Sequence, residues 1–209
     1  MRWPRVAITA AGASSRMGGL KALLPWNGRP LLEHMIASSR RAGLERIVVV
    51  TGAGREQIEP VAAGLGVDRI HNAEHAAGRF SSVRLAARWA AGRPLLLWPV
   101  DCPAVGASTL GRLAHAALLH PEASIVPLHG GHGGHPVVLP AAVVATLAAA
   151  EGDGNLRDAV RRAPGGRVMV EVSDSAVLDN LNTPHDYRRF LETRPLPAQT
   201  PAGMGVRHG

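Results

Sequence analysis

The chain contains very little lysine. Of its 23 Lys and Arg residues only Lys21 is lysine, and it follows a short apolar segment and a glycine-containing loop. An ammonium group is a compact point charge that fits among several phosphate oxygens, whereas a planar guanidinium group prefers a bidentate edge. The position of Lys21 therefore predicts a phosphate-binding loop, and Lys21 is the first candidate for a functional residue.

Cysteine, aromatic residues and long apolar runs are also scarce. The single cysteine, Cys102, excludes an internal disulfide and suits a reducing compartment, so we expect a cytoplasmic location. Four Trp, two Phe and one Tyr do not interleave with basic stretches, which argues against nucleic acid as a partner. No apolar run reaches the roughly 18 residues of a membrane span, so no membrane partner is expected.

The remaining composition favours one folded domain with an anionic ligand. The chain has 209 residues, 46% of them hydrophobic, which is enough for one sizeable core. Its formal net charge of +7 comes from dispersed arginines and favours small anionic substrates. A proline-rich end predicts a flexible tail over residues 193–209, after a domain that covers residues 1–192.

Short aliphatic runs alternate with longer amphipathic stretches. This alternation predicts crossover units, and therefore a three-layer α/β/α sandwich with a mainly parallel, Rossmann-like central sheet. The expected strands are Val6–Ala10, Arg46–Thr51, Val67–His71, Pro94–Pro99, Ser124–Pro127, His135–Leu139 and Arg167–Val172. The expected helices are Pro30–Ala42, Arg55–Ala63, Ser81–Ala91, Val105–Leu119, Ala141–Ala150 and Leu156–Ala163, with another beginning near Thr183.

The loop that ends at Lys21 differs from the two commonest nucleotide-binding motifs. It lacks the three-glycine dinucleotide spacing, and Ala22 stands where a P-loop needs Ser or Thr for magnesium. Its glycines let the backbone approach a ligand, while Ser14, Ser15 and Arg16 offer hydroxyl groups and charge. The alternative is an ordinary turn with solvated charges.

A second candidate site follows the apolar run that ends at Pro99. Asp101 comes directly after this run, and open parallel sheets bind ligands at the carboxyl ends of their strands. A carboxylate there suits Mg²⁺, which would bridge triphosphate oxygens. Two alternatives stay open for this segment: Asp101 could cap the helix expected near Val105, and Cys102 is more simply a buried small residue than a nucleophile.

The loop as a whole resembles a known family. The motif Ala10-Ala11-Gly12-x-Ser14-x-Arg16-Met17-Gly18-x-x-Lys21 is similar to the signature loop of the molybdenum cofactor nucleotidyltransferases, and Leu24-Pro25-Trp26-Asn27-Gly28-Arg29-Pro30-Leu31-Leu32 fits the stretch that follows it. The resemblance covers roughly residues 4–191. It implies the nucleotide-diphospho-sugar transferase type of Rossmann-like fold. It also implies nucleotide contacts from Ala10, Ala11, Gly12, Ser14, Ser15, Gly18 and Lys21.

Three weaker elements of the same family follow along the chain. Gly78-Arg79-Phe80-Ser81-Ser82 is similar to an element that closes over the nucleotide, which implies contacts from Ser81 and Ser82, although Ser81 could also be a plain helix N-cap. Gly134-His135-Pro136-Val137 is similar to an element on the acceptor side of the cleft. Gly152-Asp153-Gly154-Asn155-Leu156-Arg157 departs from its family pattern at Asn155, and it implies that Asp153 and Arg157 contact the acceptor.

The metal site implied by the resemblance has an unusual second half. In the family an Asp-x-Pro element like Asp101-Cys102-Pro103 holds the metal, and a later acidic or amide position completes the site. Here Asn180 and Asn182 replace both aspartates of that later element. An amide oxygen can still bind Mg²⁺ but contributes no charge.

The resemblance implies transfer of a nucleoside monophosphate from an NTP to a phosphorylated acceptor, with Lys21, Arg16 and Asp101 as catalytic residues and Mg²⁺ as the cofactor. Ala11 favours the cytidylyl branch, since the guanylyl branch usually has a second glycine there, so CTP is the expected donor. The expected acceptor is molybdopterin, with a molybdoenzyme as a protein partner. The alternatives are a sugar phosphate as acceptor, or a non-catalytic nucleotide-binding accessory protein.

Overall fold

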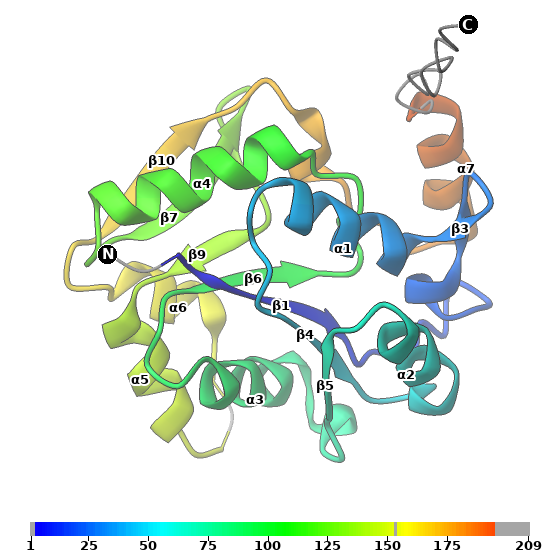
Figure 1. The fold of residues 1–209 in the computed structure, drawn as a ribbon, viewed down its shortest axis with the longest axis horizontal. Helices are drawn as coiled ribbons and strands as arrows, with labels where there is room; N and C mark the ends of the chain where they lie inside the picture. The colour runs from blue at the N-terminus through cyan, green and yellow to red at the C-terminus, as the bar shows by residue number, and fades with distance from the viewer. Residues whose placement is uncertain (1–2, 153, 195–209) are drawn as a thin grey trace, which may run out of the picture.

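A mainly parallel eight-stranded sheet forms the middle layer of the protein (Figure 1). The structure is a computed structural model that describes residues 3–152 and 154–194. The strand order is β10-β7-β9-β6-β1-β4-β5, with β8 paired to β7, and β9 is antiparallel to both β6 and β7. The strands are β1 Arg5–Ala10, β4 Ile47–Thr51, β5 Asp68–His71, β6 Leu95–Pro99, β7 Ser124–His129, β8 His132–Gly133, β9 Val137–Leu139 and β10 Arg167–Glu171.

Helices cover both faces of this sheet (Figure 1), so the predicted three-layer α/β/α sandwich is confirmed. Each predicted helix exists, with ends that differ from the prediction by at most two residues. The helices are α1 Leu31–Arg41, α2 Arg55–Gly64, α3 Arg79–Ala90, α4 Ala107–Leu119, α5 Ala141–Ala149, α6 Leu156–Arg161 and α7 Pro184–Thr193. Because connections run from a strand through a helix to a parallel neighbour, the carboxyl ends of β1, β4 and β6 lie at the same edge of the sheet.

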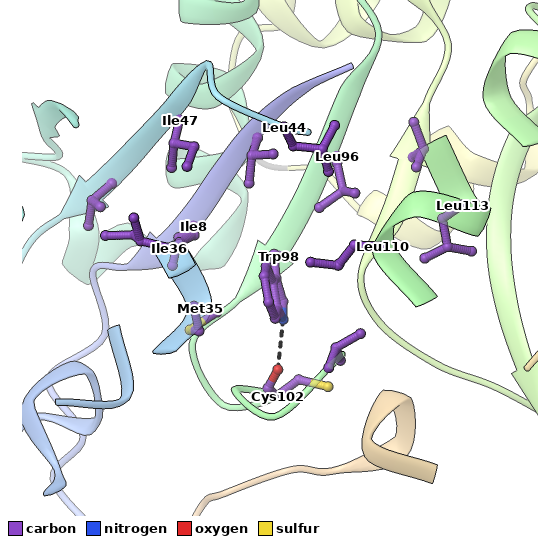
Figure 2. Close-up of a cluster of buried hydrophobic side chains, with 14 of the residues drawn as sticks. Ile8, Met35, Ile36, Leu44, Ile47, Leu96, Trp98, Cys102, Leu110 and Leu113 are labelled. Atoms are coloured by element: carbon purple, nitrogen blue, oxygen red, sulfur yellow. Dashed lines mark hydrogen bonds between the residues drawn. The ribbon is translucent and has the colours of Figure 1, made fainter. Parts of the chain in front are cut away.

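The central strands are buried on both faces, which explains their continuous apolar sequences. In β1, Val6 and Ile8 pack on the side of α1, α2 and α4, while Ala7 packs on the side of α3, α5 and α6. Trp98 in β6 is the largest fully buried side chain, and its Nε1 donates a hydrogen bond to the Cys102 carbonyl oxygen at 2.7 Å (Figure 2). This bond ties the end of β6 to the turn that carries Asp101.

Several short elements were not expected from the sequence. A hairpin of β2 Pro25–Trp26 and β3 Arg29–Pro30 follows the first loop, and three 3₁₀ helices occur at η1 Lys21–Leu23, η2 His75–Ala77 and η3 Ser175–Leu178. Segments this short give no periodic pattern to detect. They lie around the candidate site, so the prediction missed local structure mainly where the site is built.

The first two residues of the predicted tail belong to the described part of the chain. Thr193 is the last residue of α7, and Arg194 binds Asp179. The rest of the predicted tail, residues 195–209, lies outside the described residues. Within the ranges 3–152 and 154–194, no helix combines the length and the hydrophobicity that crossing a bilayer requires.

Asp174 caps the start of α4 from a distant part of the chain. Its Oδ2 accepts hydrogen bonds from Gly106 N and Thr109 Oγ1, both at 2.9 Å, and its Oδ1 accepts one from Ala176 N at 3.1 Å. Because these donors lose their acceptor, we expect Asp174→Ala to lower the free energy of unfolding by about 1–2 kcal/mol, measured by urea denaturation. Asp174→Asn keeps one acceptor oxygen and should lose less. Equal urea midpoints for D174A and wild type would contradict the capping role.

Candidate active site

The loop after β1 turns tightly at the carboxyl edge of the sheet. Ser14 has a left-handed backbone conformation (φ 50°), and its carbonyl oxygen accepts a hydrogen bond from Met17 N at 2.8 Å. Ala11 packs against Gly52 so closely that a Cβ on Gly52 would lie 2.5 Å from the Ala11 carbonyl oxygen. The start of the loop is therefore packed against the end of β4, while Arg16 is exposed.

Lys21 begins η1 and points into the site. Its Nζ donates a hydrogen bond to Asn182 Oδ1 at 3.0 Å and lies 4.0 Å from Asp101 Oδ2, and its side chain is only 11% exposed. Burial lowers the pKa of Lys21 below that of a free lysine, the Asp101 carboxylate opposes this shift, and the Arg79 and Arg16 charges add to it. The amine is thus a fixed donor beside a carboxylate, which is the arrangement expected of a phosphate-binding lysine.

Asp101 lies in the turn after β6 and faces Lys21 with a side chain that is 14% exposed. The alternative that it caps the next helix is wrong. Gly106 is the N-cap of α4, and Asp174 supplies the capping oxygen. The Asp101 carboxylate is therefore free to face cations at the sheet edge.

Asn180 and Asn182 lie beside Lys21 because α7 is anchored close by. Asn182 Nδ2 donates a hydrogen bond to Asn180 Oδ1 at 2.7 Å. A capping box between Thr183 and Asp186 starts α7, and hydrogen bonds from the Asn182 and Thr183 backbones and the Thr183 side chain lower the pKa of Asp186. This anchoring fixes the amide that binds the lysine.

The β2–β3 hairpin and α7 pack together, and this packing connects the Lys21 loop to the Asn182 segment. Trp26 Nε1 donates a hydrogen bond to the Arg194 carbonyl oxygen at 3.1 Å, and the centroids of the Trp26 and Phe190 rings lie 5.1 Å apart. Tyr187 Oη also donates to the Pro25 carbonyl oxygen. The loop that carries Lys21 and the segment that carries Asn182 are thus fixed relative to each other by packing that no local sequence pattern indicates.

Ser81 and Ser82 have different positions at the start of α3. Ser82 lines the cavity described below, whereas Ser81 is buried and donates to the Gly78 carbonyl oxygen at 2.7 Å. Asn72 Nδ2 donates to both hydroxyl oxygens, at 2.8 and 2.9 Å. The N-cap of α3 is Gly78, so the alternative that Ser81 is the N-cap is wrong. Its hydroxyl group instead holds the loop before α3 in place.

His135 lies at the other side of the site, next to β9. Its Nδ1 is buried and has no hydrogen-bond partner among the described residues, and burial lowers its pKa, so the ring is neutral at pH 7. The backbone is held by a bond from His135 N to the Val177 carbonyl oxygen at 2.8 Å. A Cβ on Gly134 would lie 2.2 Å from that oxygen, so only glycine permits this close approach.

A cavity of about 1170 Å³ connects these groups. Twelve predicted site residues line it: Ala11, Gly12, Ser14, Ser15, Arg16, Lys21, Ser82, Asp101, His135, Arg157, Asn180 and Asn182. Ala10, Gly18 and Ser81 do not line it, and Asp153 lies outside the described residues. Asn155, where the family pattern has glycine, is the N-cap of α6 and accepts a hydrogen bond from Arg157 N.

The cavity also contains residues that sequence reasoning missed. Arg79 lies 3.9 Å from Asp101 Oδ2, and Arg167 and Met169 reach the cavity from β10. Arg79 stands inside a recognised motif, but nothing in the motif shows that its side chain extends to Asp101. For the β10 residues no signal was available, since their approach depends on how β10 pairs with β7.

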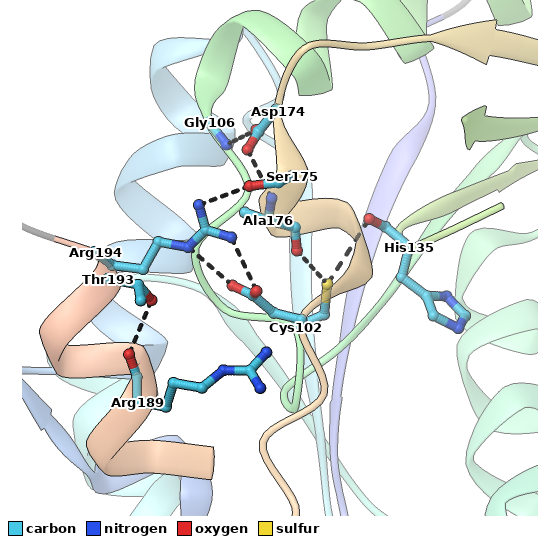
Figure 3. A network of polar contacts seen from close by, with 10 residues as sticks. Cys102, Gly106, His135, Asp174, Ser175, Ala176, Arg189, Thr193 and Arg194 are labelled. Carbon is cyan, nitrogen blue, oxygen red and sulfur yellow. Dashed lines mark hydrogen bonds and ion pairs between the residues drawn. The ribbon is translucent and has the colours of Figure 1, made fainter. Parts of the chain in front are cut away.

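The contacts of Asp179 and Cys102 show that both side chains have structural roles. Arg194 binds both Asp179 oxygens, at 2.9 and 3.3 Å, and also donates to Ser175 Oγ (Figure 3). This pairing neutralises Asp179. The Cys102 thiol donates to the Ala176 carbonyl oxygen at 3.0 Å, and burial raises its pKa well above the usual range, so it is not a nucleophile at neutral pH.

The donor atoms of the site fit magnesium better than zinc. Among the residues placed in the structure, no cluster of three or more His, Cys, Asp or Glu side chains could hold a metal. Asp101 offers one carboxylate, and Asn180 and Asn182 lie near the same lysine with amide oxygens. Mg²⁺ keeps several waters and is held by one or two carboxylates together with substrate phosphates, so such a sparse, open donor set suits it.

Comparison with known proteins identifies relatives along most of the chain. The model of the MobA-like NTP transferase domain matches residues 6–168. The chain is 30% identical over 181 residues to the molybdenum cofactor cytidylyltransferase of Escherichia coli K12, covering 86% of this chain and 91% of that protein. It is 34% identical over 201 residues to a molybdenum cofactor guanylyltransferase of Xanthomonas euvesicatoria, covering 92% and 96%.

A solved structure also shares the architecture. A nucleotidyl transferase from Methanothermobacter superposes with a TM-score of 0.78 and 25% sequence identity, covering 92% of this chain and 97% of that one. The predicted Rossmann-like nucleotidyltransferase fold and the resemblance found in the sequence are both confirmed. The two curated relatives bear names that differ in the base transferred.

Proposed function

The chain belongs to the MobA-like NTP transferase family, and from this premise we propose that it transfers CMP from CTP to molybdopterin and releases pyrophosphate. The nucleotidyltransferase activity follows from the family. The observation that carries the proposed site is the Lys21–Asp101–Asn182 cluster, in which the only lysine of the sequence has a side chain that is 11% exposed and lies beside a carboxylate in the lining of a 1170 Å³ cavity.

In the proposed reaction an oxygen of the acceptor phosphate attacks the α-phosphorus of CTP. A new P–O bond forms there, the bond from the α-phosphorus to the oxygen bridging the β-phosphate breaks, and that oxygen leaves on pyrophosphate. Lys21 and Arg16 neutralise the triphosphate, and no protein nucleophile is needed. Mg²⁺, held by Asp101 with Asn180 or Asn182, would offset negative charge on the phosphate oxygens.

The acceptor is proposed to bind toward His135, Arg157 and Arg167. The two arginines would bind a phosphomonoester, and His135 lines the same cavity. A molybdoenzyme that receives the product remains a proposal from the family resemblance, as does a cytoplasmic location. A sugar phosphate is the alternative acceptor.

The choice of CTP depends mainly on Ala11. Its methyl group is buried where the guanylyl branch usually has glycine. We expect CTP with Mg²⁺ to raise the melting temperature more than GTP or ATP, because a ligand that binds only the folded state stabilises it. Pyrophosphate release with molybdopterin or with sugar phosphates then tests transfer.

The experiment also separates the enzyme from a non-catalytic accessory protein, the alternative raised by Asn180 and Asn182 in place of carboxylates. An accessory protein would be stabilised by nucleotide but would release no pyrophosphate with any acceptor. A larger rise in melting temperature with GTP than with CTP would overturn the choice of donor. In that case Ala11 does not select the base, and Ala11→Gly should not increase the rise seen with GTP. Absence of stabilisation by every NTP would contradict the proposed site.

A further inference from the structure

Two cations approach the same oxygen of Asp101. Oδ2 lies 4.0 Å from Lys21 Nζ and 3.9 Å from Arg79 Nη2. The two side chains differ in their surroundings, since Lys21 is 11% exposed and bonded to Asn182, whereas Arg79 is 87% exposed. Among the described residues the ion pair with Asp101 is the one polar contact recorded for the Arg79 side chain.

Arg79 lines the cavity and is held there weakly. It starts α3 directly after Gly78, whose φ of 113° redirects the backbone, and it lines the same cavity as Lys21 and His135. Burial is the main reason that the pKa values of Lys21 and His135 are lowered, and the positive charge of Arg79 adds to both shifts, so Arg79 acts on groups on both sides of the cavity. An exposed ion pair of this length contributes little to stability, so moving the side chain costs little.

A divalent cation on Asp101 changes this balance. A divalent cation on this carboxylate would be repelled by the two cations that lie within 4.0 Å of its Oδ2, so withdrawal of one of them favours metal binding. Lys21 is fixed by burial and by its amide partner, whereas Arg79 is free to turn. A triphosphate that arrives with the metal offers oxygens that a guanidinium group binds in bidentate fashion.

We propose that Arg79 is a mobile substrate-binding residue, which pairs with Asp101 in the nucleotide-free protein and turns to the triphosphate when a divalent cation occupies the carboxylate. This inference rests on the proposed function, because it requires a metal at Asp101 and a triphosphate beside it. It assigns one side chain two opposite effects: Arg79 weakens binding of the metal alone and strengthens binding of the nucleotide.

The opposite signs provide the test. For Arg79→Gln we expect Mn²⁺, used as a paramagnetic substitute for Mg²⁺ and titrated without nucleotide, to bind about threefold to tenfold more tightly, measured by electron paramagnetic resonance. The affinity for CTP in the presence of metal should fall about tenfold, measured by calorimetry. Arg79→Lys keeps the charge but loses the planar fork, so its Mn²⁺ affinity should stay near wild type while CTP still binds more weakly.

Arg112→Gln is the matched control, because it removes the same charge from an exposed position. Arg112 lies on α4, which packs on the opposite face of the sheet from α3. The substitution should change neither affinity. Equal Mn²⁺ affinity in R79Q and wild type, or a parallel loss of both affinities, would overturn the inference. If wild type itself binds neither Mn²⁺ nor CTP, the proposed function fails instead, so the two failures are distinguishable.

Discussion

Replacing Lys21 with alanine should reduce nucleotidyl transfer by about 100- to 1000-fold, the usual effect of removing one preorganised donor from a developing phosphate charge. The fold should survive, because the Nζ contacts lie at the cavity edge and the η1 backbone does not depend on them. Pyrophosphate release measures the loss. Lys21→Arg should recover little, since a planar guanidinium group prefers bidentate contacts and is a poor substitute for the point charge of an ammonium group among phosphate oxygens.

The single lysine permits a direct test of contact. An amine-reactive reagent has only Lys21 as a lysine target, so peptide mass spectrometry reports its modification without interference from other lysines. CTP with Mg²⁺ should protect Lys21 from modification. Equal labelling with and without CTP would contradict the proposed role.

The pH dependence of CTP binding gives a second test of the same residue. Because burial lowers the pKa of Lys21, its charge is lost at a lower pH than that of a free lysine, and CTP affinity should fall as the pH rises through that value.

Replacing Asp101 with asparagine should have the second large effect. The substitution keeps the size of the side chain but removes the one carboxylate that, among the residues described by the structure, lies within 4.0 Å of the Lys21 and Arg79 charges. We expect transfer to fall about 1000-fold and Mn²⁺ binding to be lost, since amide oxygens alone bind divalent cations weakly.

Stability distinguishes this effect from unfolding. Among the described residues, the contacts of the Asp101 carboxylate are the two ion pairs, while its backbone carbonyl oxygen accepts a hydrogen bond from Leu181 N that the substitution leaves in place, so the melting temperature of D101N should stay close to that of wild type. Glu45→Gln, an exposed carboxylate in the loop before β4, is the control and should leave metal binding and transfer unchanged. Retention of Mn²⁺ affinity in D101N would move the metal site away from this edge.

Predictions from the sequence succeeded where a feature depends on local contacts and failed where it depends on residues far apart in the chain. The buried strands and the helices between them were predictable, because continuous apolar runs and helical spacing are local properties of the chain. The role of Asp101 could not be separated from helix capping in the sequence, and it was decided when Asp174, far along the chain, supplied the cap. Ser81 likewise was expected at the nucleotide, yet Asn72 holds its hydroxyl group in the buried frame.

What the sequence determined by itself is the layered architecture, the family to which the loop ending at Lys21 belongs, and the candidate residues at the carboxyl ends of β1 and β6. These depend on periodicity and on motifs only a few residues long. Only the tertiary structure decided that Asn182 binds Lys21, that Arg194 neutralises Asp179 and that Arg79 reaches Asp101. These contacts join residues 15 to 161 positions apart, and no local pattern encodes such a separation, because it is set by how α7, α3 and the turn after β6 pack in the folded chain.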